Sequence, residues 1–494
     1  MTEQNENTED YNRLMQQRLE KLAKIKEKGI NPYPYRYTQD KYSVDLHKKY
    51  ENLEKEDASP DYYHIAGRIM LLRKLGKVAF ISLQDQKGRI QLMLRSNVLK
   101  NYDILDLLDV GDIIGAYGNV IRTKTGELSI NVEKLDLLSK SIRPMPEKYH
   151  GLKDTELRYR MRYLDLIMNP EIKETFIKYS KMYDSFRKSL NAQNFIEMHT
   201  PILQPMYGGA NARPFISHLN ALDMDVYLRI SNELYLKRLL VGGFERVYEF
   251  ARDFRNEGVD KTHNPEFTQI EIYQAYADYN DMMRLTEQLV SQAAIDLNGT
   301  TKAKFGECEI DFAPPWRRIS MKDAIKEYAD IDIDALSNEQ LMDLVDQHAL
   351  EIEGNYTEGK IVSALFEKYC EEKLIQPTFV IQHPIESTPL CKPDPTNPNY
   401  VERFETFVAG FELANAYSEL NDPVLQRKLL EQQSAELRAG SEEAHPMDED
   451  FIRAIEFGMP PAGGVGIGID RLIMILTNSS SIRDILLFPF MKPE

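Results

Sequence analysis

Two runs of alternating apolar and polar side chains, within residues 244–276, constrain this chain more than any other stretch. The runs cover residues 247–254 and 267–273, and the polar segment between them contains Gly258 and Pro265. Alternation of this kind predicts two antiparallel strands, and the polar segment predicts a long loop that joins them. Side chains from both strands and from the loop therefore meet at the mouth of one hairpin.

The side chains at this mouth have the chemistry of a nucleotide site. Arg255 and Glu257 end the first strand, His263 and Phe267 lie on the return, and Glu271 lies deeper on the second strand. A guanidinium pairs with phosphate through two hydrogen bonds, and an aromatic ring stacks on a planar base. The pattern favours a phosphorylated base as the ligand. The alternative is a solvated hairpin with scattered charges.

The residue order of the hairpin favours the nucleotide site over the solvated hairpin. Its residues read F-R-N-E-G and, after a short gap, H-N-P-E-F-T-Q-I-E. This spelling resembles motif 2 of the class II aminoacyl-tRNA synthetases, in the form carried by the lysyl-tRNA synthetases. A helical period over residues 171–194, followed by the extended run F-I-E-M-H-T-P-I-L, resembles motif 1 of the same class. That resemblance implies a homodimer, because motif 1 builds the dimer interface in this family.

Length and composition are compatible with such an enzyme. The chain has 494 residues, 42% of them hydrophobic, and a net charge of -17, so we expect a soluble protein of two or three domains. Its acidic start has no apolar signal segment, and no run approaches the roughly 20 apolar residues that span a membrane. We therefore expect a cytoplasmic location without membrane association. Cys308, Cys370 and Cys391 are isolated, which predicts reduced thiols rather than disulfides or a zinc site.

Basic residues gather locally despite the acidic total. Residues 66–100 contain eight basic side chains against Asp85 alone, an excess of seven positive charges. This stretch is the strongest candidate for a polyanion-binding surface. A helical period over residues 11–28 also places lysines on one face, which predicts either a solvated helix face or contact with a tRNA backbone.

From residue 64 onward the pattern changes to five short strands separated by glycine turns, with a helix-like insert near residues 98–108. This order predicts a small β-barrel of the OB-fold type. The sequence G-R-I-M-L-L-R-K-L-G-K-V-A-F-I-S-L-Q-D resembles the anticodon-binding domain of lysyl-, aspartyl- and asparaginyl-tRNA synthetases. Phe80 is also open to interpretation as a core residue of the barrel. By the resemblance, the candidates for reading the anticodon are Arg73, Phe80, Gln91 and Glu127.

The predicted architecture is an α+β multidomain chain. An N-terminal OB-fold barrel precedes a class II synthetase catalytic domain, which has an antiparallel sheet, helices and a helical insertion. Prolines and glycines without a sustained period place the domain boundary near residues 141–159. The expected order is an N-terminal helical extension at 1–58, the OB-fold domain at 59–142, a linker at 143–158 and the catalytic domain at 159–494, with the insertion at about 320–373.

Two features before the hairpin are candidates for binding the amino acid. A turn at residues 208–210 contains Gly209, and small residues there allow the backbone to approach a ligand closely. Glu233 begins a helix after an extended run, where a carboxylate commonly interacts with the helix dipole. The family resemblance implies instead that Glu233 binds the α-amino group of the substrate.

A second acidic segment, after the insertion, reads E-L-A-N-A-Y-S-E-L-N-D. In a regular strand Glu412 would point away from Asn415, Tyr417 and Glu419, so we expect a bulge or turn between Glu412 and Asn415. Two carboxylates that are brought together repel each other unless a cation lies between them. Glu412 and Glu419 therefore predict a magnesium site shared with nucleotide phosphates, and two surface glutamates are the alternative.

Near the C-terminus the run G-G-V-G-I-G-I-D-R-L predicts a strand that passes into a helix. With Asp470 and Arg471 this run resembles motif 3 of the class II synthetases. The resemblance implies that Arg471 lies over the adenine, opposite Phe267, and reaches the γ-phosphate. All three motifs of the class are then present, in order.

Carboxylates with aromatic walls predict which amino acid is selected. Glu271 and Glu419 project toward the expected pocket, with Tyr273 and Tyr417 beside them. Such a pocket fits a side chain with a cationic tip and an aliphatic stem. A pocket for aspartate would need a cation where Glu271 stands, so the prediction is lysine.

The expected reaction has two steps. The lysine carboxylate attacks the α-phosphate of ATP and displaces pyrophosphate, and the lysyl group then passes to the terminal ribose of tRNA(Lys). Arg255 and Arg471 are the expected catalytic residues, because positioned cations stabilise phosphoryl chemistry. The resemblance implies up to three Mg²⁺ ions bound with ATP. The expected nucleotide residues are Arg255, Glu257, His263, Asn264, Phe267, Glu412 and Arg471, and the expected lysine residues are Gly209, Glu233, Arg255, Glu271, Tyr273, Asn415, Tyr417 and Glu419.

Two other classes of protein stay open. One is an RNA-binding or regulatory relative that kept the fold without catalysis. Loss of Arg255, Glu412, Glu419 or Arg471 would mark that case, and all four are present. The other is a lysyl-transferase that modifies a protein, but such relatives lack the OB-fold that this sequence predicts.

Overall fold

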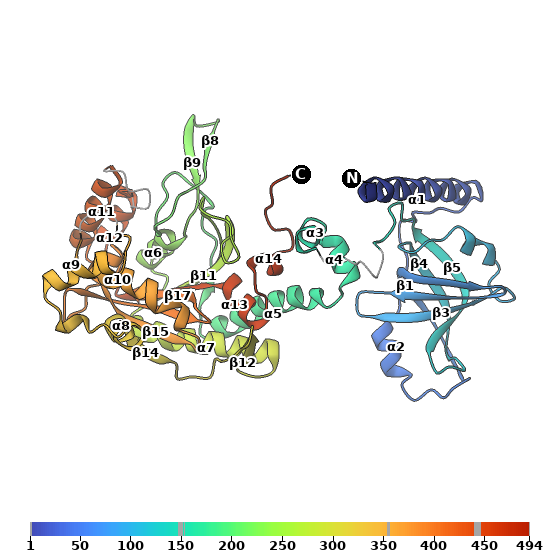
Figure 1. Ribbon diagram of the computed structural model, residues 1–494. Coiled ribbons are helices and arrows are strands. Elements are labelled where there is room, and N and C mark those ends of the chain that lie inside the picture. Colours follow the sequence, from blue (N-terminus) through green and yellow to red (C-terminus); the bar gives the residue numbers. More distant parts are fainter. Residues whose placement is uncertain (1, 147–151, 153, 353–355, 439–445, 494) are drawn as a thin grey trace. The chain divides into compact units, whose positions relative to one another are not determined.

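The computed structural model describes all residues except 1, 147–151, 153, 353–355, 439–445 and 494. The chain divides into two compact units, residues 1–151 and 152–494 (Figure 1). Each unit has a hydrophobic core of its own. The finer division, with a linker at 143–158, stays a prediction, and residues 147–151 and 153 of that linker lie outside the described residues.

The first unit is built on a closed five-stranded barrel, in the order β1-β2-β3-β5-β4. Strands β3 and β5 run parallel, and the other neighbouring pairs are antiparallel. The predicted small barrel is therefore confirmed. Its strands are β1 (Ala58–Leu75), β2 (Val78–Gln84), β3 (Arg89–Arg95), β4 (Ile113–Arg122) and β5 (Leu128–Ser139).

Alternation along the strands separates the core of the barrel from its outer face. On β2 the side chains of Ala79 and Ile81 are fully buried, whereas Phe80 between them is partly exposed. Phe80 therefore lies on the outer face, because successive side chains of a strand point to opposite sides. The helix-like insert predicted near residues 98–108 is a 3-10 turn, η1 (Tyr102–Asp106).

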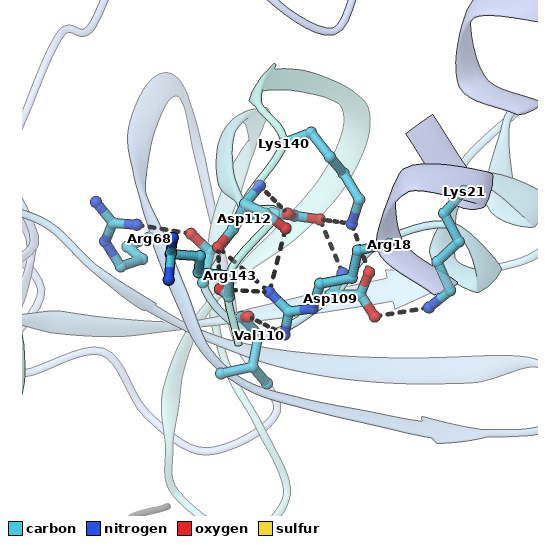
Figure 2. Close-up of polar contacts among 10 residues, drawn as sticks. Arg18, Lys21, Arg68, Asp109, Val110, Asp112, Lys140 and Arg143 are labelled. Carbon is cyan, nitrogen blue, oxygen red and sulfur yellow. Dashed lines mark hydrogen bonds and ion pairs between the residues drawn. The ribbon is translucent and has the colours of Figure 1, made fainter. Parts of the chain in front are cut away.

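Helix α1 (Thr2–Glu27) contains the helix that the sequence predicts at 11–28. Its Ile25 is fully buried in the core of the barrel. Its Arg18 is also largely buried, and the guanidinium donates hydrogen bonds to three backbone oxygens of the barrel unit (Figure 2). These carbonyl oxygens belong to Val110, Ser141 and Arg143. Arg18 is thus held by hydrogen bonds to the barrel unit and does not lie on a solvent-exposed face of α1.

Lys140 is the centre of a buried ion-pair network beside Arg18 (Figure 2). Its fully buried ammonium lies 2.5 Å from Asp109 and 2.8 Å from Asp112. Lys21 of α1 forms a second ion pair with Asp109, at 2.6 Å. Two lysines are thus matched by two aspartates inside this unit.

The second unit is organised on an eight-stranded sheet, in the order β14-β15-β16-β17-β18-β11-β10-β6 (Figure 1). The predicted hairpin is β10 (Arg246–Phe254) and β11 (Glu266–Ala275), which pair antiparallel residue by residue. β11 also pairs with β18, so the hairpin lies within the sheet. The antiparallel catalytic sheet is therefore confirmed, with parallel pairs only at its ends. Its other strands are β6 (Ile196–Glu197), β14 (Arg317–Ser320), β15 (Thr378–Pro384), β16 (Tyr400–Val408), β17 (Phe411–Ser418) and β18 (Ala462–Gly468).

Helices bury one face of this sheet in the main apolar core. Ile270 and Ile272 of β11 belong to this core. Glu271 and Tyr273 alternate with them and so point to the opposite face. The residues of β11 that the sequence assigns to the lysine site therefore share one side of the sheet. The helices on the apolar face are α5 (Ile172–Asn191), α7 (Tyr279–Asn298) and α13 (Ile469–Leu476).

A smaller apolar cluster supports the opposite face. It joins Tyr273 and Tyr417 of the sheet to the buried faces of three helices. The walls of the lysine site are therefore held from behind by packing, which keeps their rotamers fixed. The three helices are α6 (Glu233–Val241), α11 (Pro423–Arg438) and α12 (Glu449–Glu456).

The acidic helical stretch that follows β14 has a core of its own. Val380 of β15 and Phe407 of β16 join this core, so the helices pack on that end of the sheet (Figure 1). Residues 353–355 within the stretch lie outside the described residues. Its elements are α8 (Met321–Ala329), η2 (Ile333–Ala335), α9 (Asn338–Gln347), α10 (Glu358–Tyr369) and η3 (Glu371–Lys373).

The remaining elements are short. The extended run that the sequence predicts before residue 204 forms regular strand at its two ends, at β6, which pairs with β10, and at the start of β7, which pairs with β9. Over the part of the chain that the structure describes, no helix combines the length and the apolarity needed to cross a membrane. The other elements are α2 (Ser43–Lys49), α3 (Thr155–Arg160), α4 (Arg162–Met168), β7 (Leu203–Gln204), β8 (Ile216–Leu219), β9 (Met224–Leu228), β12 (Lys302–Phe305), β13 (Cys308–Asp311), η4 (Ile385–Ser387) and α14 (Ile482–Ile485).

Candidate active site

A cavity of about 420 Å³ lies against the hairpin and is lined by residues of β11, β17 and β18. All fourteen residues that the sequence assigns to the nucleotide and lysine sites line this cavity. They come from the turn at Gly209, the start of α6, the hairpin, β17 and the start of α13. The fold thus brings the whole predicted set together, and the role of each residue stays a prediction.

Arg255 lies at the mouth of the hairpin, just after β10. Its backbone amide donates to the carbonyl oxygen of Pro265 at 2.9 Å, which closes the loop. Its guanidinium lies 5.0 Å from the centre of the Phe267 ring, a cation–π contact. Its Nε is buried and has no hydrogen-bond partner among the described residues. A buried donor without a partner costs free energy, which a bound anion would recover.

Arg471, in the first turn of α13, connects β17 with the hairpin loop. One guanidinium nitrogen donates to the backbone oxygen of Glu412 at 2.5 Å and lies 3.5 Å from the carboxylate of the same residue. The other lies 3.4 Å from Nε2 of His263. The buried carboxylate of Asp470 accepts a hydrogen bond from the Thr268 amide, which fixes the start of α13 against β11.

A bulge in β17 brings Glu412 to the cavity. Two consecutive residues of β16 pair with Ala414 and Glu412, so Leu413 is an extra residue in β17. The irregularity predicted between Glu412 and Asn415 is therefore confirmed. Bulges change the direction of neighbouring side chains, and here Leu413 is buried in the core while Glu412 and Asn415 both line the cavity.

Three buried carboxylates, those of Glu233, Glu271 and Glu419, lie deeper in the cavity. Glu233 accepts a hydrogen bond from the hydroxyl of Tyr417 at 2.8 Å. Glu271 accepts one from the hydroxyl of Tyr273 at 3.0 Å. The predicted aromatic walls therefore also orient the carboxylates beside them.

Glu271 has no ion-pair partner among the described residues. Its second oxygen accepts a hydrogen bond from the side-chain amide of Gln269 at 3.2 Å, and the same amide donates to Asp253 at 2.6 Å. The carboxylate of Glu271 is thus held by neutral donors only. Its negative charge is left for a ligand to match.

Lys237 is the cation that the sequence analysis missed. It lies one turn after Glu233 on α6, is fully buried, and its Nζ lies 2.5 Å from Glu233 and 2.5 Å from Glu419. It also lies 5.4 Å from the centre of the Tyr417 ring. In the sequence, a glutamate and a lysine four residues apart are typical of an exposed helix pair, so no local signal separates this lysine from a solvated one.

The pocket holds more negative charge than one ammonium can neutralise. Burial opposes the charge on Lys237, but the carboxylates of Glu233 and Glu419 outweigh it and raise the pKa of the lysine. Burial and the charge of Glu233 raise the pKa of Glu271 well above its usual range. Burial also raises the pKa of Glu419 to about 8, although Lys237 acts in the opposite direction. A cationic ligand would lower the pKa values of Glu271 and Glu419 again, because it favours the charged form of a carboxylate.

Glycines make room for these side chains. A Cβ on Gly464 would lie 2.1 Å from an oxygen of Glu419 and 2.4 Å from the Tyr273 ring, so only glycine fits there. A Cβ on Gly466 would lie 3.0 Å from Glu271. The glycine-rich strand β18 is thus the floor of the pocket. Gly209 has a positive φ of +87°, which suits the close approach of its turn to the start of α6.

Glu412 and Glu419, predicted to share a magnesium ion, have different partners. Glu419 is fully buried and paired with Lys237, whereas Glu412 is partly exposed and lies beside Arg471. The two carboxylates therefore have separate contacts, and a magnesium ion shared between them stays a prediction. Within the described ranges, no group of three or more His, Cys, Asp or Glu side chains has an arrangement that would hold a metal by itself.

Glu405 of β16 is a second acidic residue that the sequence analysis missed. It lines the cavity with Glu412 and accepts a hydrogen bond from Arg403 at 2.5 Å. Burial raises the pKa of the nearby Glu371 to about 7, and the charges of Glu405 and Glu412 contribute. An Mg²⁺ ion bound mainly by phosphates needs only one or two carboxylates, so Glu405 and Glu412 fit that role. Only the pairing of β16 with β17 brings them together.

In the barrel unit, the anticodon candidates lie away from the core. Arg73 is exposed and pairs in register with Phe80, and Glu127 is exposed before β5. The side-chain amide of Gln91 donates to the hydroxyl of Ser129 at 2.9 Å. The roles of these four residues stay predictions. The positive excess of residues 66–100 is smaller in three dimensions, because acidic residues outside the stretch pair with Lys74 and Lys87.

Comparison with known proteins defines the class. Residues 154–492 match the family of class II tRNA synthetases (D, K and N), and residues 63–138 match the OB-fold nucleic acid binding domain. The chain belongs to the class II tRNA synthetases.

Similar relatives share one name within this class. The lysine–tRNA ligase of Pelotomaculum thermopropionicum is 52% identical, over 98% of this chain and 96% of its own length. That of Clostridium novyi is 50% identical, over 98% and 95%. That of Bacillus subtilis is 48% identical over the whole of both chains. The similarity therefore covers both the barrel and the catalytic unit.

Proposed function

We propose that this protein is a lysine–tRNA ligase. It activates L-lysine with ATP to lysyl-adenylate, releases pyrophosphate, and transfers lysine to the 3′ end of tRNA(Lys) during protein synthesis. Its family and its full-length similarity to proteins of that name support this function. The observation that carries it is a pocket with three buried carboxylates and one resident ammonium, a site for a cationic amino acid.

The proposal assigns the amino acid to the deep end of the cavity. Glu233 binds the α-amino group, next to the backbone at Gly209. Glu271 and Glu419 bind the ammonium at the tip of the side chain, with Tyr273 and Tyr417 as walls for its stem. Asn415, which accepts a hydrogen bond from Arg403 at 3.0 Å, completes this end. A carboxylate paired with the substrate in a water-excluded pocket contributes strongly to selectivity.

The proposal assigns ATP to the hairpin end. Arg255 bridges the lysine carboxylate and the α-phosphate, which brings the reacting groups together and neutralises charge that develops in the displacement. Phe267 and Arg471 enclose the adenine, and Arg471 with His263 neutralises the outer phosphates. Glu257 and Asn264 position the nucleotide. No residue of the chain has to act as a nucleophile.

Magnesium is part of this proposal. The partly exposed Glu412 and its neighbour Glu405 are the residues that would hold Mg²⁺, because both line the cavity beside Arg471. When bound, Mg²⁺ neutralises phosphate charge and orients the pyrophosphate. We assign Glu419 to the lysine and not to this ion, because it is fully buried and shares Lys237 with Glu233, whereas Glu412 lies beside Arg471. Up to three ions per ATP remain the expectation.

The barrel is the proposed anticodon reader. Phe80 on its outer face would stack on a base, and Arg73, Gln91 and Glu127 would contact base edges and backbone. A homodimer and a cytoplasmic location complete the proposal, and both are implied by the family.

The test is amino-acid-dependent ATP–pyrophosphate exchange with each of the twenty amino acids, followed by aminoacylation of tRNA(Lys). We expect exchange with lysine only and transfer to tRNA(Lys). Exchange with aspartate or asparagine would give the enzyme a different substrate. Lysine exchange without transfer to any tRNA would favour a relative that modifies another acceptor.

A further inference from the structure

Lys237 is a buried lysine whose contacts suggest a role in the amino-acid site. It is fully buried, four residues after Glu233 on α6, and its ammonium contacts the carboxylates of Glu233 and Glu419, which come from different elements. These two carboxylates belong to the proposed amino-acid site. A lysine of the chain therefore lies inside the wall of a pocket proposed to bind lysine.

The charges of the pocket show what this resident ammonium does. Glu233, Glu271 and Glu419 are three carboxylates, and Lys237 neutralises one charge among them. With all three ionised, as two bound cationic groups would favour, a net charge of two negatives remains. The proposed substrate has two ammonium groups, one at Cα and one at the tip of its side chain, so the remaining charge matches it.

The contacts of Glu233 and Glu419 show that these carboxylates are also held in a defined orientation. One oxygen of Glu233 contacts Lys237, and the other accepts the hydroxyl hydrogen of Tyr417. Both oxygens therefore have a defined orientation before any ligand enters. Glu419 is oriented by Lys237 on one side and by the glycine floor at Gly464 on the other. Without a cation between them, Glu233 and Glu419 would repel each other and leave this arrangement.

We propose that Lys237 is a positioning residue of the amino-acid site, which holds Glu233 and Glu419 in the arrangement that receives the two ammonium groups of lysine. This inference rests on the proposed function. Lys237 does not line the cavity, so in the proposed arrangement it contacts neither ATP nor the reacting atoms, and its effect is confined to the amino acid. The opposing explanation is a buried ion pair that serves only the stability of the fold.

The barrel supplies a matched control. Lys140 is also fully buried and also lies between two carboxylates, Asp109 and Asp112, in the other unit of the chain (Figure 2). Replacement of either lysine by methionine keeps an unbranched chain of similar length and removes a buried ammonium from between two carboxylates, although Asp109 keeps its ion pair with Lys21. Both variants therefore lose a buried ion-pair centre, and they differ in their relation to the pocket.

The experiment compares Lys237→Met and Lys140→Met in full-length protein by ATP–pyrophosphate exchange, with separate titrations of lysine and ATP. For Lys237→Met we expect the KM for lysine to rise at least 10-fold while the KM for ATP changes less than about twofold. For Lys140→Met we expect a lower Tm, with both KM values within about twofold of the unmodified protein. Thermal melting of both variants measures the shared structural effect.

Other outcomes would overturn the proposal. A Lys237→Met protein that melts early but keeps its KM for lysine has lost only a structural ion pair. A rise of both KM values together would place Lys237 in general support of the cavity. If Lys237→Met does not fold, Lys237→Gln, which keeps a donor without charge, takes its place: the same rise is expected, and an unchanged KM for lysine counts against the proposal.

Failure of the proposed function is distinguishable from failure of this inference. If the unmodified protein does not exchange pyrophosphate with lysine, the substrate assignment is wrong. If it does, and the Lys237 variants keep their KM for lysine, only the positioning role is wrong.

Discussion

Lys140 in the barrel and Lys237 in the catalytic unit are both fully buried between two carboxylates, but their surroundings differ. Asp109 beside Lys140 has a second partner in Lys21, and these two lysines lower the pKa of Asp109 although burial opposes them. In the pocket, the pKa of Glu271 is raised, because burial and the charge of Glu233 act on a carboxylate without a cationic partner.

The difference separates a structural network from a binding site. In the barrel, Lys140 and Lys21 face Asp109 and Asp112 inside the protein, so this ion-pair network is complete without a ligand. In the pocket, full ionisation of the three carboxylates would leave two negative charges beyond the charge of Lys237. The raised pKa values of Glu271 and Glu419 reflect this, since a desolvated charge without a partner is costly unless a ligand supplies one. Unmatched buried charge in a cavity, rather than buried charge as such, is what indicates function here.

The largest expected effect is in the pocket. Glu271→Gln removes a charge that the chain does not match, so it strands the substrate's ammonium, and one-sided removal of such a pair costs about 3 to 5 kcal/mol. We expect kcat/KM for lysine to fall roughly 100-fold to 1,000-fold or more, with little change in the affinity for ATP. A folded variant with an undiminished kcat/KM for lysine would contradict the pocket assignment.

In the barrel, the corresponding change should alter stability and not activity. Asp112→Asn leaves the buried Lys140 with one carboxylate fewer, and we expect the free energy of unfolding of this unit to fall by about 3 kcal/mol. Denaturant unfolding measures this loss. ATP–pyrophosphate exchange below the unfolding transition should stay normal, and impaired exchange would mean that the barrel network supports the catalytic site.

Phe80→Ala tests whether the outer face of the barrel binds the anticodon. Loss of one stacked base costs about 1 to 3 kcal/mol, so kcat/KM for tRNA in aminoacylation should fall accordingly. Exchange without tRNA should be unaffected. Equal losses in both assays would assign Phe80 a structural role.

The smallest expected effect concerns Glu371, whose pKa of about 7 reflects burial and the carboxylates of Glu405 and Glu412. Because this pKa is raised in the folded state, the folded protein keeps a proton that the unfolded chain releases, and stability falls as the pH rises from about 4.5 to about 7. Glu371→Gln should therefore raise the free energy of unfolding at pH 8 by about 1 kcal/mol, after allowance for partial exposure.

Two comparisons control that measurement. At pH 4, where the carboxyl is protonated in both states, Glu371→Gln and the unmodified protein should unfold alike. With MgATP bound, the gain at pH 8 should shrink, because the ion neutralises the neighbouring carboxylates. A gain that is independent of pH would exclude this electrostatic origin.

Much of the fold followed from local patterns. Alternation predicted the hairpin of β10 and β11, and short strands with glycine turns predicted the barrel, because side-chain period and turn residues act over a few neighbours. The bulge between Glu412 and Asn415 was also predicted, since strand parity alone would point these residues apart. The extended run before residue 204 forms regular strand only at its two ends, because β6 and β7 find partner strands and the residues between them do not.

The site was predicted unevenly for a physical reason. Residues that belong to a recognisable motif, such as Arg255 and Arg471, line the cavity as the sequence predicted. Glu405 and Lys237 were missed, because their meaning depends on which strand or carboxylate lies across from them. The ion pair of Glu419 was missed for the same reason, since its partner Lys237 is 182 positions earlier in the chain, and the metal assignment of Glu419 stays a prediction.

The sequence by itself determined the class of fold, the hairpin at its centre and the residues with recognisable chemistry, because strand period, turn chemistry and motif spelling are local properties. Only the tertiary structure decided which charges are matched. It buried Lys237 between Glu233 and Glu419 and gave Glu271 no cationic partner among the residues that the structure describes. Coulomb interactions depend on distance in space and on exclusion of water, and neither can be read from positions along a chain.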